Sequence, residues 1–441
     1  MTIEWTENVD TFFFLFLITL LLFTKGIYYF LRCSSYQLAI VKVFILLVVI
    51  LIFTNGIFKS IQYSEKILLP DDGNEFTAIS AVRCFAEKGF TSNFGLPDFN
   101  CYNTTDMQRT EIAYDPLKVK IPYIYTHQPP APYWLPGLFF KLCGGDDYGC
   151  LRILSTITSS FALSFFAIML FYTLGPLKSA VALFFVAIIP MTWNMVYTFH
   201  YHNYTFSLFL IQLGFLLYFF KKKIKLSNSN LATLAILGFI QGWFSFEYFL
   251  LISLSPLSFA LLYSQIDNKE DRKRFILVTF FLVVGCCFAF LLHFIQNSLY
   301  FGSVTGAFRD LFERGRTRLL SQPIRWEIDR ISMLLNYFFL YPRSFNFFII
   351  NFPVFLGVTL ILMWFQHITI TIQNPIQVKL QWISSRRNYF VILTALLASF
   401  LWIFIMYNHA SSEIAHLPRI IFFSYFVCIL TILECISLNN S

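Results

Sequence analysis

Residues 275–295 read FILVTFFLVVGCCFAFLLHFI, a run of 21 residues that contains no Asp, Glu, Lys or Arg. A helix of about 20 apolar residues spans the roughly 30 Å hydrocarbon layer of a bilayer. Only helices and closed barrels satisfy their backbone hydrogen bonds in lipid. The run therefore predicts a membrane-spanning helix.

The composition of the whole chain agrees with this prediction. Hydrophobic residues make up 57% of the 441 residues and charged residues 13%, whereas soluble domains carry about 25% charged residues. The net charge of +8 comes from short basic clusters between apolar runs. Because these clusters form no single basic patch, we expect no nucleic-acid partner.

Apolar runs of spanning length recur along the chain and predict an all-α, polytopic membrane protein with about 11 transmembrane helices. Residues 1–441 then form a single transmembrane domain. The eleven runs are residues 11–31, 38–58, 152–173, 177–198, 204–220, 230–246, 248–264, 275–295, 345–366, 389–407 and 419–437.

Three basic loops predict the orientation of these helices. Lys and Arg cluster in residues 221–225, 269–274 and 386–387, and short basic loops stay on the cytoplasmic side. The N-terminus is then outside and the C-terminus inside. Two long loops, residues 59–151 and 296–344, face outward.

Four of the nine cysteines fall in the first outer loop: Cys84, Cys101, Cys143 and Cys150. In an oxidising compartment they can form two disulfides in any of three connectivities. Cys143 and Cys150 are the pair nearest in sequence. The alternative is four free thiols in a packed loop.

An acidic segment opens the first outer loop. Residues 69–76 read LPDDGNEF, with Asp71, Asp72 and Glu75 close together. The next residues have helical spacing, with apolar side chains on one face, and predict an amphipathic helix that lies on the membrane with carboxylates at its N-terminal end. The alternative is that the Asp or Asn side chains only cap this helix.

A proline-rich segment closes the same loop. Residues 125–137 read YTHQPPAPYWLPG, and such segments are stiff and extended. The aromatic residues suit a membrane interface. The segment is either part of a site or simply an interfacial anchor.

These segments, taken together and in order, resemble a known family. The motifs are Asp-Gly-Asn-Glu-Phe at 72–76, His-Gln-Pro-Pro-Ala-Pro-Tyr-Trp-Leu at 127–135, Phe-Phe-Lys-Leu-Cys-Gly at 139–144 and Leu151-Arg152. They resemble polyprenyl-phosphate-dependent glycosyltransferases of the GT-C type, in the bacterial branch related to protein O-mannosyltransferases and the lipid A aminoarabinose transferase. The resemblance covers about residues 68–220.

The resemblance implies inverting transfer of a sugar from a polyprenyl-phosphate donor to a lipid, glycan or protein acceptor at the outer face. Asp72 stands where the family keeps the acidic residue that acts on the acceptor hydroxyl, as a general base would; Asp71 and Glu75 are its alternates. The family commonly has a basic residue before the Pro of the second motif, for the donor phosphate. Gln128 stands there, beside His127.

The second outer turn, residues 199–205, carries His200, His202 and Asn203. In the resembling family an Asp often stands at the position of Asn203. A divalent metal held by Asp72, His200 and His202 is one expectation, because imidazole and carboxylate suit zinc or manganese. Interfacial hydrogen bonding is the alternative, and we expect no other cofactor.

The second long outer loop carries seven Arg residues and no Lys. Arg binds phosphate with a bidentate fork, so this loop suits an anionic lipid head group. Ion pairs with Asp310, Glu313, Glu327 and Asp329 are the alternative. The expected donor-phosphate residues are Arg314, Arg316, Arg318, Arg325 and Arg419, with His127 and Gln128. The other Arg residues of the loop are Arg309, Arg330 and Arg343.

We therefore expect a membrane glycosyltransferase that contacts membrane lipid. Its expected location is a bacterial inner membrane or, in a eukaryote, the endoplasmic reticulum membrane. A lipid-linked glycan ligase or polymerase is the first alternative. A transporter or flippase is the second, although it would place ionisable groups deep in the spans. Glu247, between two predicted spans, is an ionisable residue near the membrane edge.

Overall fold

The computed structural model describes most of the chain. The described residues are 36–64, 74–99, 101, 124–126, 129–142, 148–187, 189, 192–193, 195–199, 201–264, 268–320, 368–371, 377–380, 386–405, 417–435 and 437–438. The predicted spans 11–31 and 345–366 lie outside these residues.

Within the described residues, five helical segments are long and apolar enough to cross a membrane. They are α2 (Tyr36–Gln62), α6 (Tyr148–Leu174), α9 (Tyr201–Lys221), α11 (Phe249–Tyr263) with the short η3 (Phe246–Tyr248) before it, and α12 (Lys269–Tyr300). The predicted class, a mainly helical membrane protein, is confirmed at this level. Eleven spans stay a prediction.

Four further helices coincide with predicted spans within the described residues. They are α7 (Pro176–Ala187), α10 (Asn228–Phe244), α16 (Arg386–Ile405) and α18 (Leu417–Cys435). The span predicted at 177–198 differs most, because its helix has only 12 residues and ends at Ala187. Pro190 follows three residues later in the sequence, and the residue before a proline disfavours the helical conformation.

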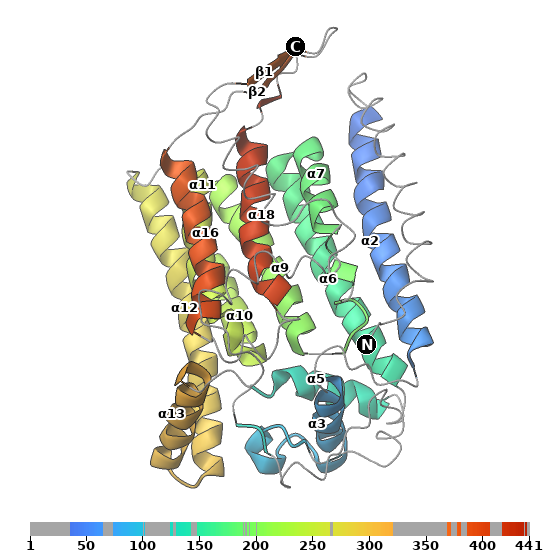
Figure 1. The fold of residues 1–441 in the computed structure, drawn as a ribbon, viewed down its shortest axis with the longest axis vertical. Coiled ribbons are helices and arrows are strands. Elements are labelled where there is room, and N and C mark those ends of the chain that lie inside the picture. Colours follow the sequence, from blue (N-terminus) through green and yellow to red (C-terminus); the bar gives the residue numbers. More distant parts are fainter. Residues whose placement is uncertain are drawn as a thin grey trace.

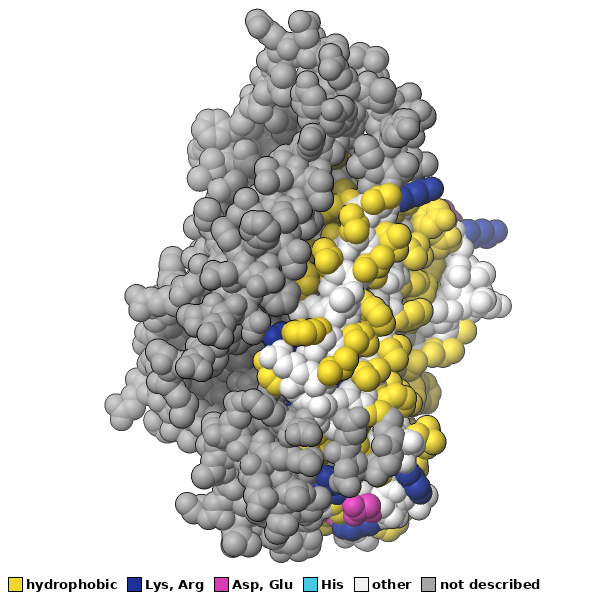
Figure 2. Space-filling view, turned by 90° about the vertical axis from the view of Figure 1, so that its right-hand side faces the viewer, with side chains coloured by type: hydrophobic (Ala, Val, Ile, Leu, Met, Phe, Trp, Pro, Cys, Tyr) yellow, Lys and Arg dark blue, Asp and Glu magenta, His cyan; other side chains and the backbone are white. Residues whose placement is uncertain are grey.

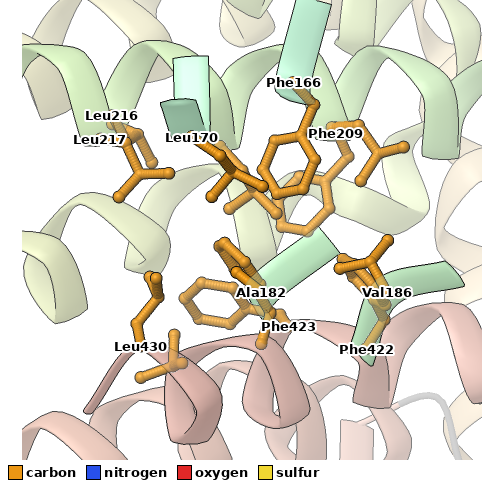
Figure 3. Packing of buried hydrophobic residues seen from close by; sticks show 14 of the residues in the cluster. Phe166, Leu170, Ala182, Val186, Phe209, Leu216, Leu217, Phe422, Phe423 and Leu430 are labelled. Atoms are coloured by element: carbon orange, nitrogen blue, oxygen red, sulfur yellow. The ribbon is translucent and has the colours of Figure 1, made fainter. Parts of the chain in front are cut away.

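The helices pack side by side into a bundle (Figure 1). Its core joins α6, α7, α9 and α18, and Figure 3 shows Phe166, Phe209 and Phe422 in this packing. The Phe166 and Phe426 rings lie 5.1 Å apart, centroid to centroid, in an edge-to-face arrangement, which is a favoured geometry for aromatic pairs. The abundant Phe residues thus fill the space between helices.

The outward face of the bundle is apolar. Figure 2 shows one such face, where hydrophobic side chains cover most of the described surface and charged groups are few. On α2 the exposed apolar side chains are Val43, Leu46, Leu47, Ile50, Phe53, Phe58 and Ile61. A surface this apolar suits lipid and not water.

Glycines bring α10 and α12 into close contact. A Cβ atom on Gly238 would lie 2.1 Å from the Leu282 carbonyl oxygen, and one on Gly285 would lie 2.0 Å from the Ala235 carbonyl oxygen. Small residues of this kind let helix backbones approach each other in a membrane.

We therefore expect Gly238→Ala to destabilise the protein. In a free helix Gly→Ala stabilises by about 1 kcal/mol, but here the methyl group overlaps backbone, and overpacking costs about 1–3 kcal/mol. A lower thermal unfolding midpoint in detergent is the expected result. Ala232→Leu, on the exposed face of α10, is the control and should change little. A midpoint raised by Gly238→Ala would contradict the close contact.

A small antiparallel sheet was not predicted. The strands β1 (Ile368–Thr371), β2 (Gln377–Leu380) and β3 (Ser437–Leu438) pair in the order β1-β2-β3. The β1 sequence Ile-Thr-Ile-Thr alternates apolar and polar residues, as half-buried strands do. This small sheet is an addition to the predicted all-α architecture, with which the described helices agree.

The two ends of the bundle differ. At one end the Arg274 guanidinium donates to the Lys223 carbonyl oxygen at 3.1 Å and the Ile224 carbonyl oxygen at 3.3 Å, so two basic loops meet. The opposite end carries α3 (Asn74–Lys88), η1 (Ser92–Gly95), α5 (Ala131–Leu142) and α13 (Val304–Leu320) (Figure 1). We call it the outer end, following the predicted orientation.

Candidate functional site

The outer end is covered by α3 packed against α5. Ile79, Val82 and Phe85 of α3 are buried with Tyr133 and Phe140 of α5. The predicted helix is therefore present, but the prediction that its apolar face lies on the membrane is wrong. That face lies on α5.

A glycine permits this contact. A Cβ atom on Gly137 would lie 3.0 Å from the Phe85 Cβ and 3.1 Å from the Val82 carbonyl oxygen. The acidic segment leads directly into α3, and the proline-rich segment leads into α5. Two motifs that are far apart in sequence are thus carried by helices in contact.

The expected catalytic carboxylates are only partly placed. Asp71 and Asp72 lie outside the described residues, immediately before α3 begins at Asn74. Glu75 is in the first turn of α3, and its side chain is not among those described. The described residues therefore do not distinguish the two expected roles of Asp72, general base and helix cap.

A disulfide braces α3. Cys84 is bonded to Cys101, with a Cα–Cα distance of 5.1 Å, and the Lys88 ammonium lies 2.9 Å from the Asp98 carboxylate nearby. Cys150 is also disulfide-bonded; Cys143, its expected partner, lies outside the described residues. The prediction that this loop contains disulfides is confirmed, and the free-thiol alternative is wrong for these three cysteines.

We expect the double substitution of Cys84 and Cys101 by Ser to lower the free energy of unfolding by about 3 kcal/mol. The reason is that the disulfide closes a short loop and so lowers the conformational entropy of the unfolded chain. The sequence separation is 17 residues. Thermal unfolding in detergent measures the effect. Cys287→Ser, at an exposed free thiol, is the control. Equal midpoints for the double variant and the control would contradict a stabilising role.

Residues of α12 hold the first outer loop from the other side. Asn297 Nδ2 donates to the Thr126 carbonyl oxygen at 2.9 Å, and His293 Nε2 lies 2.9 Å from the same oxygen. Since a carbonyl can only accept, Nε2 carries the proton. On α13, the Asp310 carboxylate accepts from the Thr126 hydroxyl at 2.7 Å. Thr126 immediately precedes His127 and Gln128, which themselves lie outside the described residues.

A second contact fixes the η1 turn. Gln296 Nε2 donates to the Phe94 carbonyl oxygen at 2.9 Å, and Trp134 Nε1 donates to the Gly95 carbonyl oxygen at 3.2 Å. Gly95 has a φ of +78°, and a Cβ atom there would lie 2.8 Å from the Trp134 ring. Only glycine fits both demands. The loop is thus held by α5 and α12 together.

A buried histidine and a buried carboxylate are in contact at the outer end of the bundle. His202, in the first turn of α9, is 2% exposed, and Glu247 of η3 is 8% exposed. Their Nδ1 and Oε2 atoms are 3.2 Å apart. Glu247 is therefore not a freely solvated interfacial residue but a buried partner of His202.

The other two expected residues of the second outer turn are Asn203 and His200. Asn203 Nδ2 donates to the Thr198 carbonyl oxygen and hydroxyl, so it holds the turn before α9. His200 lies outside the described residues. The metal set of Asp72, His200 and His202 is thus represented by His202 alone, which contacts Glu247.

Within the described part of the chain, one group of side chains has the spacing of a metal site: Cys84, Asp98 and Cys101. The two cysteines are joined as a disulfide and offer no thiolate, which is the form that binds metal. We assign no metal to this group.

Of the expected phosphate residues, Arg316 is the one whose side chain the structure describes. Arg316 is exposed, and its guanidinium lies 2.9 Å from the Glu313 carboxylate, the geometry of the ion-pair alternative. Arg314 and Arg318 are on α13 and Arg419 is at the start of α18, but their side chains are not described. Arg325 lies outside the described residues.

Two buried arginines were not singled out as phosphate ligands. Arg152 of α6 is fully buried, and its Nη1 donates to the Tyr63 carbonyl oxygen at 2.7 Å. Arg83 of α3 is buried with its guanidinium 5.8 Å from the centre of the Phe140 ring. The signal for Arg152 was its place at the start of an apolar run, where an ionisable residue is a functional candidate by default.

The outer end thus combines four features. They are the α3–α5 layer, the first outer loop held by hydrogen bonds from α12 and α13, the buried contact between His202 and Glu247, and the buried Arg83 and Arg152.

No protein-family model, no curated protein and no solved structure matches this chain.

Proposed function

We propose that the protein is a membrane glycosyltransferase that moves a sugar from a polyprenyl-phosphate donor to a lipid, glycan or protein acceptor at its outer end. One observation carries the proposal. The two segments on which the GT-C resemblance rests lead into α3 and α5, and these helices pack against each other at one end of the bundle. A site built from both segments needs this proximity.

Asp72 is the proposed general base. The acceptor hydroxyl oxygen attacks the anomeric carbon of the donor sugar and its proton goes to the carboxylate. The bond between that carbon and the phosphate oxygen breaks, and polyprenyl phosphate leaves. Direct attack from the opposite face inverts the anomeric centre. Asp71 and Glu75 are the alternates for the base.

The leaving phosphate needs cationic or hydrogen-bonding partners. The proposed partners are Arg314, Arg316, Arg318, Arg325, Arg419, His127 and Gln128. Arg316 is open to solvent, so a phosphate can replace the Glu313 carboxylate as its partner at small cost, because exposed ion pairs contribute about 0–1 kcal/mol. A divalent metal at Asp72, His200 and His202 is an optional part of the proposal.

A transporter or flippase is the second candidate. The buried His202–Glu247 pair favours it, because buried ionisable groups in membrane bundles often mark transport paths. Such a protein would move a lipid-linked sugar across vesicles without changing it. A lipid-linked glycan ligase or polymerase would instead transfer a whole glycan.

The test uses the purified chain in vesicles that contain polyprenyl-phosphate sugars, one sugar at a time, with membrane glycolipid extracts as acceptors. We expect protein-dependent release of polyprenyl phosphate for one sugar class, with the sugar recovered on an acceptor. Movement of intact donor across the bilayer with no release would favour the flippase and contradict the transferase.

A further inference from the structure

The helix α13 carries an exposed apolar stripe. Val304, Phe308, Leu311 and Phe312 are 58%, 58%, 42% and 71% exposed. Their spacing places them on one face of the helix. Ala307, on another face, is buried. An exposed stripe with two Phe side chains is unfavourable in water and indicates a partner.

The position of α13 is fixed by contacts with α12 and with the first outer loop. It follows a short turn after α12 and folds back along it, with the Phe294 and Phe308 ring centroids 4.7 Å apart. Asp310 accepts the hydrogen bond from Thr126 described above. The helix therefore stands at the outer end of the bundle, beside the end of α12 (Figure 1).

The apolar surface of α12 is continuous with this region. Its exposed apolar side chains follow helical spacing along one face toward α13: Phe288, Leu291, Leu292, Ile295 and Leu299. With 32 residues, α12 is about 48 Å long and exceeds the roughly 30 Å hydrocarbon layer. The outer end of α12 therefore extends beyond the hydrocarbon layer, and α13 folds back beside it.

Basic side chains lie beside the apolar stripe of α13. Arg309 and Arg316 lie beside the stripe and are exposed. Phe and Leu side chains partition into the boundary between head groups and acyl chains, and anionic lipids attract basic residues beside them. The lipid bilayer is therefore the partner whose chemistry fits both features.

We propose that α13 is an interfacial helix that docks on the outer leaflet. The stripe of Val304, Phe308, Leu311 and Phe312 enters the boundary between head groups and acyl chains, and Arg309 and Arg316 bind the phosphates of anionic lipids. Arg316 is also among the proposed donor-phosphate residues, and both proposals give it a lipid-borne phosphate; the stripe and Arg309 do not depend on the glycosyltransferase proposal. Through Asp310 and Thr126, docking also ties the first outer loop to the membrane surface.

The test uses the full chain with p-benzoylphenylalanine in place of Phe308 or Phe312, reconstituted in phosphatidylcholine vesicles with and without phosphatidylglycerol. Illumination should give lipid adducts, detected by mass spectrometry of the α13 peptide. Glu313→p-benzoylphenylalanine, one residue from Phe312 on the polar side, is the matched control and should give far fewer adducts. With phosphatidylglycerol present, that lipid should be enriched among the adducts.

Arginine variants test the second half of the proposal. Arg309→Gln with Arg316→Gln should remove the enrichment of phosphatidylglycerol severalfold while lipid adducts at Phe312 persist. Cross-links from Phe312 to another segment of the chain or to a second copy, in place of lipid, would overturn the proposal. So would equal lipid labelling at Glu313 and Phe312.

Discussion

Asp72→Asn is expected to lower the rate of sugar transfer by about 10²–10⁴-fold, the usual contribution of a general base. Asparagine has nearly the size of aspartate and keeps its hydrogen bonds, but it cannot take the proton of the acceptor hydroxyl. The acidic segment enters α3 at Asn74, and α3 is fixed by the Cys84–Cys101 disulfide and by α5. The helix that follows Asp72 is therefore held in place whichever residue occupies position 72.

The control for this prediction is Asp71→Asn, which should cost much less if Asp72 has the role. The helix-cap alternative predicts something different, because Asn and Asp cap helices about equally well. Turnover and thermal unfolding of the purified variants are measured together. Near-normal turnover in Asp72→Asn would reject the base assignment, whereas lost turnover with an unchanged midpoint would reject the cap as the explanation.

Glu247→Ala is expected to destabilise the protein by about 3–5 kcal/mol, because it leaves His202 buried without its carboxylate. Removing one member of a buried ionic pair has a cost of this size, although the intact pair adds little net stability. The carboxylate and imidazole are 3.2 Å apart, and both residues are almost fully buried. Unfolding of the detergent-solubilised protein measures the effect.

A double-mutant cycle separates this pair from general damage. His202→Ala with Glu247→Ala should cost less than the sum of the single substitutions, because the two side chains contact each other and their losses are coupled. Glu313→Ala, which breaks the exposed pair with Arg316, is the matched control and should cost about 0–1 kcal/mol. Additive losses in the cycle, or equal losses at Glu247 and Glu313, would contradict a coupled buried pair.

The sequence predicted the local structure of the site better than its packing. The spacing of Ile79, Val82 and Phe85 predicted a helix, and the helix is present. The same apolar face fits a membrane surface or a neighbouring helix, because hydrophobic periodicity shows that a face is buried but not what covers it. The structure shows that α5 covers it.

Long-range pairs could not be predicted from one sequence. His202 and Glu247 are 45 positions apart along the chain, and the hydrogen bond between Thr126 and Asp310 joins two different outer loops. Composition and spacing show which residues are unusual in an apolar chain, but only the fold brings them together. The β1–β2 hairpin was missed for another reason, since its strands are only four residues each in a segment read as a cytoplasmic loop.

The central claim, sugar transfer at the outer end of the bundle, is tested most directly by mass spectrometry of cell-envelope glycans and glycolipids. Cells with the natural protein, without it, and with Asp72→Asn are compared. The account predicts that one glycan or glycolipid loses one sugar in the second and third cells, while membrane levels of the variant stay normal. Identical glycans in all three would contradict it.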